Sequence, residues 1–195
     1  MYNDPQMIKR EVIYFEQPGE KNTGACLDIL IKLAKEGYKH FVVASTSGKT
    51  GLLAAERLKD FSINLVIIGH SVGFKAPNTD EFLEENYKAV TSLGGKIYRG
   101  TILTHSLETA LAKEFSGVYP TLLIAQTLRR LGQGTKVCCE IVMEAADAGL
   151  IPDGEEVVAM AGTVKGADTV ALIKSANSKR FLALKVLEIL AKPRN

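Results

Sequence analysis

The stretch FVVASTSGKTG (residues 41–51) decides the fold of this chain. Its first part, Phe41–Ala44, is apolar throughout, which is typical of a strand covered on both faces of a parallel sheet. The hydroxyl-rich turn Ser45–Ser47 follows, and Gly48 and Lys49 lead into a helix. Such a turn directs backbone N–H groups and the positive end of a helix dipole at one spot, where a phosphate or another anion binds.

Strands and helices alternate along the rest of the 195 residues. Because alternation of this kind implies right-handed crossovers, we expect an α/β fold of three layers: one mostly parallel sheet with helices on both faces. No linker, repeat or low-complexity stretch interrupts the chain, so residues 1–195 are expected to form a single domain. Apolar runs predict strands at 12–15, 40–46, 64–69, 96–99, 156–162, 169–176 and 183–191. The last of these could instead be helical.

Capping residues predict where several helices begin. Asn22 and Thr23 are good caps for a first helix, and Thr79 caps a later one whose first turn is acidic. Thr135 is expected to cap a further helix that runs through Ala148.

Composition argues against several classes of protein. Lys and Arg number 24 and Asp and Glu 22, so the net charge is only +2, which is unlike a dedicated nucleic-acid binder. No apolar run approaches the ~18 residues of a membrane span, and the N-terminus does not resemble a signal peptide. We therefore expect a cytoplasmic protein with no nucleic-acid or membrane partner.

Cysteines and histidines give weaker indications. Cys26, Cys138 and Cys139 are odd in number and lack the spacing of a disulfide framework or a zinc site. We expect buried free thiols, with a redox role for the adjacent pair as the alternative. His70 and His105 titrate near neutral pH and could act as bases or ligands, but without paired carboxylates they do not predict a metal site.

Two motifs resemble known catalytic loops. Ser47–Thr50 looks like the end of a Walker A loop, but that motif needs a glycine where this chain has Val43, so the turn is too short to wrap a triphosphate. Gly69–Gly73 matches the G-x-S-x-G turn of α/β-hydrolases around Ser71. Pro77 disfavours the helix that should leave such a turn, so we favour a plain glycine-rich loop over an esterase.

A second polar cluster, Gly162–Thr169, follows a predicted buried strand. In an open parallel sheet, ligands lie beyond the carboxyl ends of the strands, and the unusual loops of this chain all fall there. We favour this cluster as a second wall of a ligand site over a simple β-turn. Lys49 opposes the dipole of its helix, which is reasonable if an anion binds beside it; the alternative is that it extends into water.

These residues resemble a known family. Phe41–Gly51 is similar to the strand–turn–helix of the pyruvate kinase C-terminal domain, where a T-x-S-G-x-(S/T)-A turn holds a phosphate of the sugar-bisphosphate activator; Gly51 replaces the usual Ala. The whole chain, with Tyr14–Gly19 and Ala161–Thr163, more closely resembles stand-alone relatives of unassigned activity, some with flavin mononucleotide (FMN) bound. The resemblance implies a pyruvate kinase C-terminal-like fold with antiparallel strands at the C-terminal end.

By that resemblance the turn holds the phosphate of FMN, through Thr46, Ser47, Gly48, Lys49 and Thr50. Further ligand contacts are expected mainly because ligands lie beyond the carboxyl ends of parallel strands. These contacts are expected at His70, Gly162, Thr163, Gly166, Asp168 and Thr169. Phe74 or Val164 could supply an apolar wall for the flavin ring.

Two functions stay open for this small-molecule phosphate site. One is an FMN-binding oxidoreductase or sensor, and the other is a non-catalytic module that senses a sugar phosphate. Gly48→Val is expected to abolish binding with the fold retained. Catalytic activity is left unassigned, and a homo-oligomer stays possible.

Overall fold

The structure, a computed structural model, describes residues 7–194. Its strands are β1 (Ile13–Phe15), β2 (His40–Ala44), β3 (Asn64–His70), β4 (Lys96–Gly100), β5 (Glu156–Ala161), β6 (Thr169–Lys174) and β7 (Lys185–Pro193). They form one seven-stranded sheet in the order β1-β7-β6-β5-β2-β3-β4. All strands of this sheet run in one direction except β6, which is antiparallel to β5 and β7. This confirms the predicted α/β fold with antiparallel pairing near the C-terminus.

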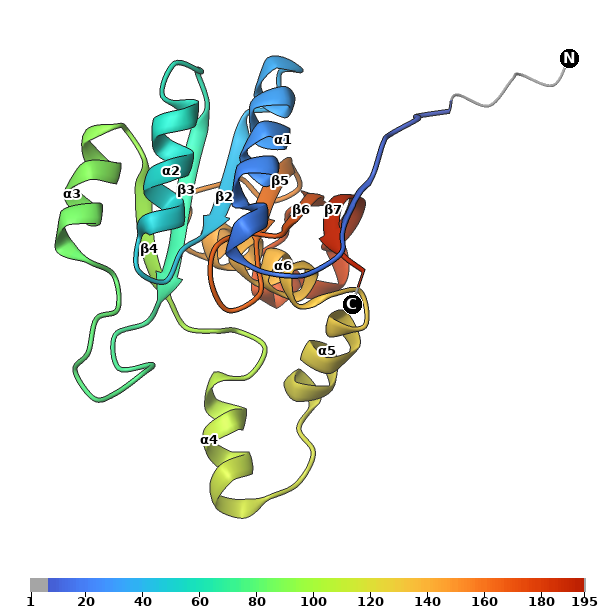
Figure 1. The fold of residues 1–195 in the computed structure, drawn as a ribbon. Helices are drawn as coiled ribbons and strands as arrows, with labels where there is room; N and C mark the ends of the chain where they lie inside the picture. Colours follow the sequence, from blue (N-terminus) through green and yellow to red (C-terminus); the bar gives the residue numbers. More distant parts are fainter. Residues whose placement is uncertain (1–6, 195) are drawn as a thin grey trace, which may run out of the picture.

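Helices cover both faces of the sheet. The α-helices are α1 (Thr23–Lys35), α2 (Lys49–Leu58), α3 (Glu84–Ser92), α4 (Ser106–Phe115), α5 (Pro120–Arg129) and α6 (Gln133–Asp147), and the short 3-10 segments are η1 (Glu20–Asn22) and η2 (Ser178–Ala183). Helices α1, α2 and α3 pack on one face and α6 on the other (Figure 1). Within residues 7–194, no helix combines the length and apolar character needed to cross a bilayer.

Strand β2 shows why the central strands are apolar throughout. Phe41 and Val43 point into the core beneath α1 and α2, whereas Val42 points into the second core beneath α6. Since successive side chains of a strand alternate between faces, a strand covered on both faces needs apolar residues at every position.

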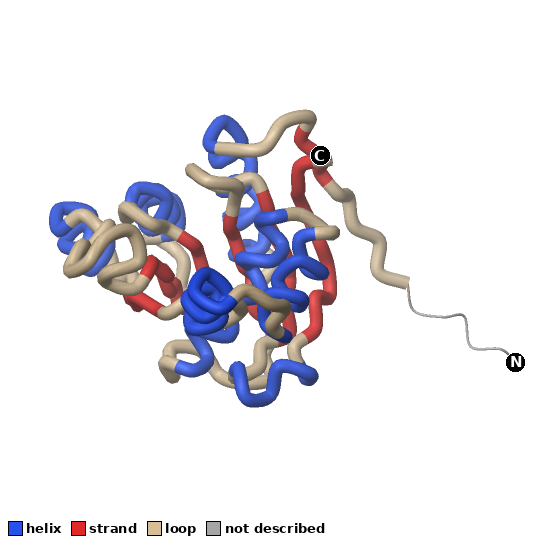
Figure 2. Tube along the Cα trace, turned by 90° about the horizontal axis from the view of Figure 1, so that it is seen from below, coloured by secondary structure: helices blue, strands red, loops and turns tan. Residues whose placement is uncertain are grey.

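The carboxyl ends of the parallel strands meet at one edge, called here the carboxyl edge. Figure 2 looks onto this edge, where the loops after β2, β3, β4 and β5 gather. The α4–α5 pair also extends from this edge, away from the sheet (Figure 1). The fold therefore places the chain's polar loops together at the carboxyl ends of the strands, where the sequence predicted them.

The predicted start of α3 is wrong. Helix α3 begins at Glu84 rather than beside Thr79. Asp80 Oδ1 accepts a hydrogen bond from Phe82 N at 2.9 Å, and Asp80 Oδ2 lies 2.9 Å from Arg99 Nε. Because these contacts hold the chain in a turn, the acidic residues after Thr79 serve tertiary pairing instead of a helix dipole.

Two further cap predictions need correction. Asn22 occupies the cap position of α1, but its side-chain amide donates to Gln17 O at 2.8 Å and caps nothing. Helix α6 begins at Gln133 with Gly132, at φ 123°, in the cap position. Thr135 therefore lies within the first turn of α6.

Gly134→Ala is expected to lower the free energy of unfolding by about 1–3 kcal/mol, because an added Cβ would overpack the contact between α6 and β6. That Cβ would lie 2.0 Å from Thr169 Oγ1 and 2.4 Å from Thr169 Cβ. Gly24→Ala is the matched control, at the same second position of α1. No neighbour among residues 7–194 comes within 4 Å of a Cβ there, so it should stabilise the protein by up to about 1 kcal/mol. Urea unfolding measures both; equal effects would contradict the close contact at Gly134.

Candidate functional site

The turn after β2 presents consecutive backbone N–H groups. Gly48 has a left-handed φ of 87° and occupies the cap position of α2. On either side of the turn the backbone N–H groups are paired: Ser45 N donates to Ile68 O at 2.9 Å, and Leu52 N donates to Gly48 O at 2.8 Å. Between them, in the described part of the chain, the N–H groups of residues 46–50 have no acceptor. Unpaired N–H groups at a helix N-terminus attract an anion.

The back of this turn is held by the segment before α3. Ser47 O accepts hydrogen bonds from Leu83 N at 3.2 Å and from Asn86 Nδ2 at 2.8 Å. A Cβ at Gly48 would lie 2.6 Å from Asn86 Cβ and 2.6 Å from Phe82 Cε1. The expectation that Gly48→Val leaves the fold intact is therefore wrong, because a side chain there disturbs packing as well as the left-handed backbone.

Side chains of the turn differ in their exposure. Thr46 and Ser47 are half-buried and Lys49 is exposed, so their polar groups are accessible at the carboxyl edge. Thr50 is buried, which leaves its backbone N–H as the group offered to a ligand.

The loop between β5 and β6 lies beside this turn. Val43 of β2 pairs with Met160 of β5, so the two strands end next to each other. Gly162 and Gly166 close the loop: a Cβ at Gly162 would lie 2.6 Å from Gly166 O, and one at Gly166 would lie 2.5 Å from the Cα of Glu20. The structure thus brings the two predicted walls together.

Asp168 lies inside the protein instead of on the surface of this loop. It is 0% exposed, and its Oδ2 accepts hydrogen bonds from Gly19 N at 2.9 Å and from Thr163 N at 3.1 Å. Its Oδ1 accepts one from Thr169 Oγ1 at 2.8 Å, and Thr169 is also buried. Asp168 therefore ties the loop to the segment before α1 and Thr169 holds its carboxylate, while Thr163 and Gly166 are nearer the surface.

His70 ends β3 beside the same turn. Its Nδ1 lies 3.0 Å from Glu81 Oε2, and its ring packs against Phe74 with centroids 4.2 Å apart. No sequence pattern pointed to Glu81 as a site residue, because it lies in the segment predicted to be helical. Phe74, a predicted apolar wall, is half exposed at this edge.

Helix α6 carries a buried cluster of charges that the sequence pattern did not predict. Lys136, Glu140 and Glu144 are spaced by four residues, so they share one face of the helix, and all three are only 2–5% exposed. The Lys136 ammonium pairs with Glu140, which also accepts a hydrogen bond from Thr104 Oγ1 and lies 3.7 Å from His105 Nδ1. The cluster thus anchors the loop between β4 and α4.

Burial and mutual charge set the ionisation of this cluster. Burial raises the pKa of Glu144 from 4.5 to about 8, and the neighbouring Glu140 charge adds to the rise. Burial opposes ionisation of Glu140 too, but the nearby His105 side chain and the Lys136 charge lower its pKa overall. Burial lowers the pKa of Lys136, and the charge of Glu140 opposes that change. The Lys136–Glu140 pair therefore lies beside a Glu144 carboxyl whose burial favours its protonated form.

The cysteines are buried free thiols, as predicted. Burial raises the pKa of Cys26 and of Cys139 to about 12 and that of Cys138 well above its usual 9.0. Since the thiolate is the reactive form, burial lowers the reactivity of the adjacent pair.

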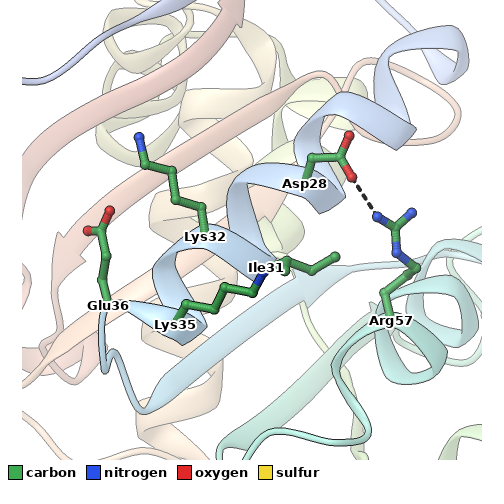
Figure 3. Close-up of a pocket in the computed structure, with 6 residues that line it drawn as sticks. All are labelled: Asp28, Ile31, Lys32, Lys35, Glu36 and Arg57. Atoms are coloured by element: carbon green, nitrogen blue, oxygen red, sulfur yellow. Dashed lines mark hydrogen bonds and ion pairs between the residues drawn. The ribbon is translucent and has the colours of Figure 1, made fainter.

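A surface depression of about 490 Å³ lies away from the carboxyl edge, on the face of α1 and α2 (Figure 3). Asp28 and Arg57 form an exposed ion pair across it at 2.5 Å. Figure 3 shows Lys32 and Lys35 pointing apart, so the charged groups do not converge on a point where a ligand could bind. The depression is lined by Asp28, Ile31, Lys32, Lys35, Glu36 and Arg57.

Comparison with known families assigns the chain. The model of the family "Pyruvate kinase, alpha/beta domain" matches residues 25–174, which are 150 of the 195 residues. The chain belongs to this family. The matched range runs from α1 to the end of β6 and so contains both the turn and the β5–β6 loop. Membership of the pyruvate kinase alpha/beta family fits a ligand-sensing or allosteric role.

Proposed function

We propose that the chain binds a phosphate-bearing small molecule at the carboxyl edge, with FMN as the first candidate and a sugar bisphosphate as the alternative. The observation that supports this most is the row of N–H groups at residues 46–50, which has no acceptor within residues 7–194 and stands at the N-terminus of α2. Thr46, Ser47 and Lys49 add hydroxyl and ammonium donors, so the donor set suits a phosphate.

Apolar side chains around the turn favour a ligand with a large ring over a bare sugar. Val72 and Phe74 lie on the β3–α3 loop and Val164 on the β5–β6 loop, and all three are exposed. Bound FMN would supply redox chemistry, whereas this chain's residues would hold its phosphate and cover its ring. In this arrangement Thr163 and Gly166 border the ligand, and His70, Gly162, Asp168 and Thr169 support the loops around it.

A titration distinguishes the candidate ligands. Purified protein is expected to quench FMN fluorescence and to gain thermal stability with FMN, by about 2.7 kcal/mol when the ligand is at 100 times its Kd. Riboflavin, which lacks the phosphate, should bind far more weakly. Stabilisation by a sugar bisphosphate but not by FMN would favour the alternative, and no response to either would overturn the proposal.

Lys49→Glu is expected to weaken FMN binding by about tenfold or more, because it replaces an attractive charge beside the phosphate with a repulsive one, worth at least about 1.4 kcal/mol. The fold should be unharmed, since an acidic residue suits the first turn of a helix. Lys59→Glu at the other end of α2, also exposed, is the matched control and should leave the Kd unchanged. Equal effects of the two variants on the Kd, measured by fluorescence titration, would place the phosphate elsewhere.

A further inference from the structure

Asn86 is a buried polar residue in the first turn of α3, and it is only 7% exposed. Because a buried amide needs hydrogen-bond partners, its contacts indicate its role. Asn86 Nδ2 donates to Ser47 O at 2.8 Å, across 39 positions of the sequence. The side chain therefore acts on the turn after β2.

The carbonyl that Asn86 holds decides where the next N–H group points. The peptide between Ser47 and Gly48 is trans, so the C=O of Ser47 and the N–H of Gly48 point in opposite directions. Ser47 O is directed toward α3 by the hydrogen bonds from Asn86 Nδ2 and, at 3.2 Å, from Leu83 N. The Gly48 N–H therefore points away from α3, and within residues 7–194 it has no acceptor.

Glycine makes this peptide free to turn over. Gly48 has a φ of 87°, and glycine adopts φ values of either sign about equally well. A flipped peptide would present the Ser47 carbonyl to an anion at the turn, and an acceptor there would repel it. The flip would also leave the buried Asn86 Nδ2 without its acceptor, which costs free energy. Asn86 thus favours the orientation that offers a donor.

The segment that carries Asn86 is itself fixed to the sheet. The Arg99 guanidinium of β4 lies over the rings of Phe82 and Tyr87, 5.6 Å and 5.0 Å from their centroids. Arg99 Nε also lies 2.9 Å from Asp80 Oδ2. Helix α3 packs beside α2, the helix that begins at the turn (Figure 1). Asn86 is therefore held in one place relative to the turn.

We propose that Asn86 is a positioning residue for the phosphate site: it holds the Ser47–Gly48 peptide so that the Gly48 N–H faces the bound phosphate. This inference rests on the proposed function, because it requires an anion at the turn. Asn86 lies behind the turn and acts on the ligand only through this peptide. Its effect is therefore confined to the phosphate and does not extend to the rest of the ligand.

Titration of the full chain with inorganic phosphate, followed by the Gly48 amide signal in proton–nitrogen NMR spectra, tests the positioning. In the wild type this signal should move downfield as phosphate binds. Asn86→Leu keeps the side-chain shape but removes the donor. It should raise the phosphate Kd by about tenfold or more, the effect of losing one hydrogen bond to a charged group.

Asn64→Leu is the matched control. Asn64 Nδ2 also donates to a backbone carbonyl at 2.8 Å, that of Leu150, but Asn64 begins β3 and so lies at the other end of the strand from the carboxyl edge. This variant should leave the phosphate Kd unchanged.

FMN and riboflavin provide a readout that a purely structural role would not change. The ratio of the riboflavin Kd to the FMN Kd measures what the phosphate contributes to binding. Asn86→Leu should lower this ratio by about tenfold and leave the riboflavin Kd unchanged. Asn86→Ala serves for both titrations if the Leu variant does not fold. Equal losses of FMN and riboflavin affinity would show that Asn86 supports the fold alone.

The outcomes separate this inference from the proposed function. An unchanged phosphate Kd in a folded Asn86 variant would overturn the positioning role and leave the proposed function standing. A Gly48 signal that phosphate does not move in the wild type would also overturn the positioning role. If Asn86→Leu weakens phosphate binding at the turn but neither FMN nor a sugar bisphosphate binds the wild type, the positioning role stands and the proposed function fails.

Discussion

Lys136→Met is expected to lower the free energy of unfolding by about 3–5 kcal/mol at neutral pH, because it removes one partner of a buried ion pair. Lys136 and Glu140 are both nearly inaccessible, and Glu144 lies one turn further along the same face. Without the ammonium, the Glu140 carboxylate is left in the core beside Thr104 and His105. Methionine has similar length and is apolar, so the variant tests charge more than volume. Urea unfolding followed by circular dichroism measures the change.

An exposed pair of the same spacing is the matched control for this variant. Lys88 lies 3.5 Å from Glu84 on α3, and both side chains are mostly exposed. Lys88→Met should change stability by less than about 0.5 kcal/mol. The double variant Lys136→Met/Glu140→Gln should regain part of the loss, since a neutral pair is cheaper to bury than a single charge. A loss at Lys136 as small as that at Lys88 would contradict the buried ion pair.

Glu144→Gln is expected to stabilise the protein in alkaline solution and to have little effect in acid. Burial raises the pKa of Glu144 to about 8 in the folded chain, against 4.5 as its ordinary value. Between these two pH values the folded chain holds a proton that the unfolded chain has released. The Glu144 contribution to stability is therefore present below the unfolded pKa, is lost as the pH rises toward about 8, and is constant above it.

The size of this effect follows from the shift in pKa. At about 1.4 kcal/mol per pKa unit, the difference between variant and wild type should grow by the order of 3–5 kcal/mol from acid to alkaline solution. Chemical unfolding at a series of pH values measures it. Glu56→Gln, at an exposed position of α2, should give a difference that does not vary with pH in this range. A flat difference for Glu144→Gln as well would show that this carboxyl ionises in the ordinary range.

The sequence was most informative where local pattern and tertiary environment agree. Apolar runs such as Phe41–Ala44 predicted the central strands because both faces of the sheet are covered. Prediction failed at Thr79, since the acidic residues after it pair with Arg99 and His70, which lie on other strands. Capping propensity is a weak local preference, and a few tertiary contacts outweigh it.

The loops of the candidate site were predicted from the sequence, whereas Glu81 and the buried charges of α6 were not. Glycines and hydroxyls mark the turn and the β5–β6 loop in the sequence itself. Glu81 and the α6 cluster were missed because their partners lie elsewhere in the chain: Glu140 meets Thr104 from 36 residues away. One signal could have revealed the cluster. The apolar residues of α6 lie on every side of the helix, so no side of it is left to face solvent. The charged residues at 136, 140 and 144 must therefore be buried.

The place of β5 in the sheet has a consequence for how the protein folds. Strand β5 lies between β2 and β6, and its pairing of Met160 with Val43 joins residues 117 positions apart. Contacts of such long sequence separation form slowly, because the intervening chain must be ordered first. On the ribosome, the first half of the chain emerges with one side of β2 unpaired and exposed, and the turn after β2 acquires its neighbouring loop only after α6 and β5 have been synthesised.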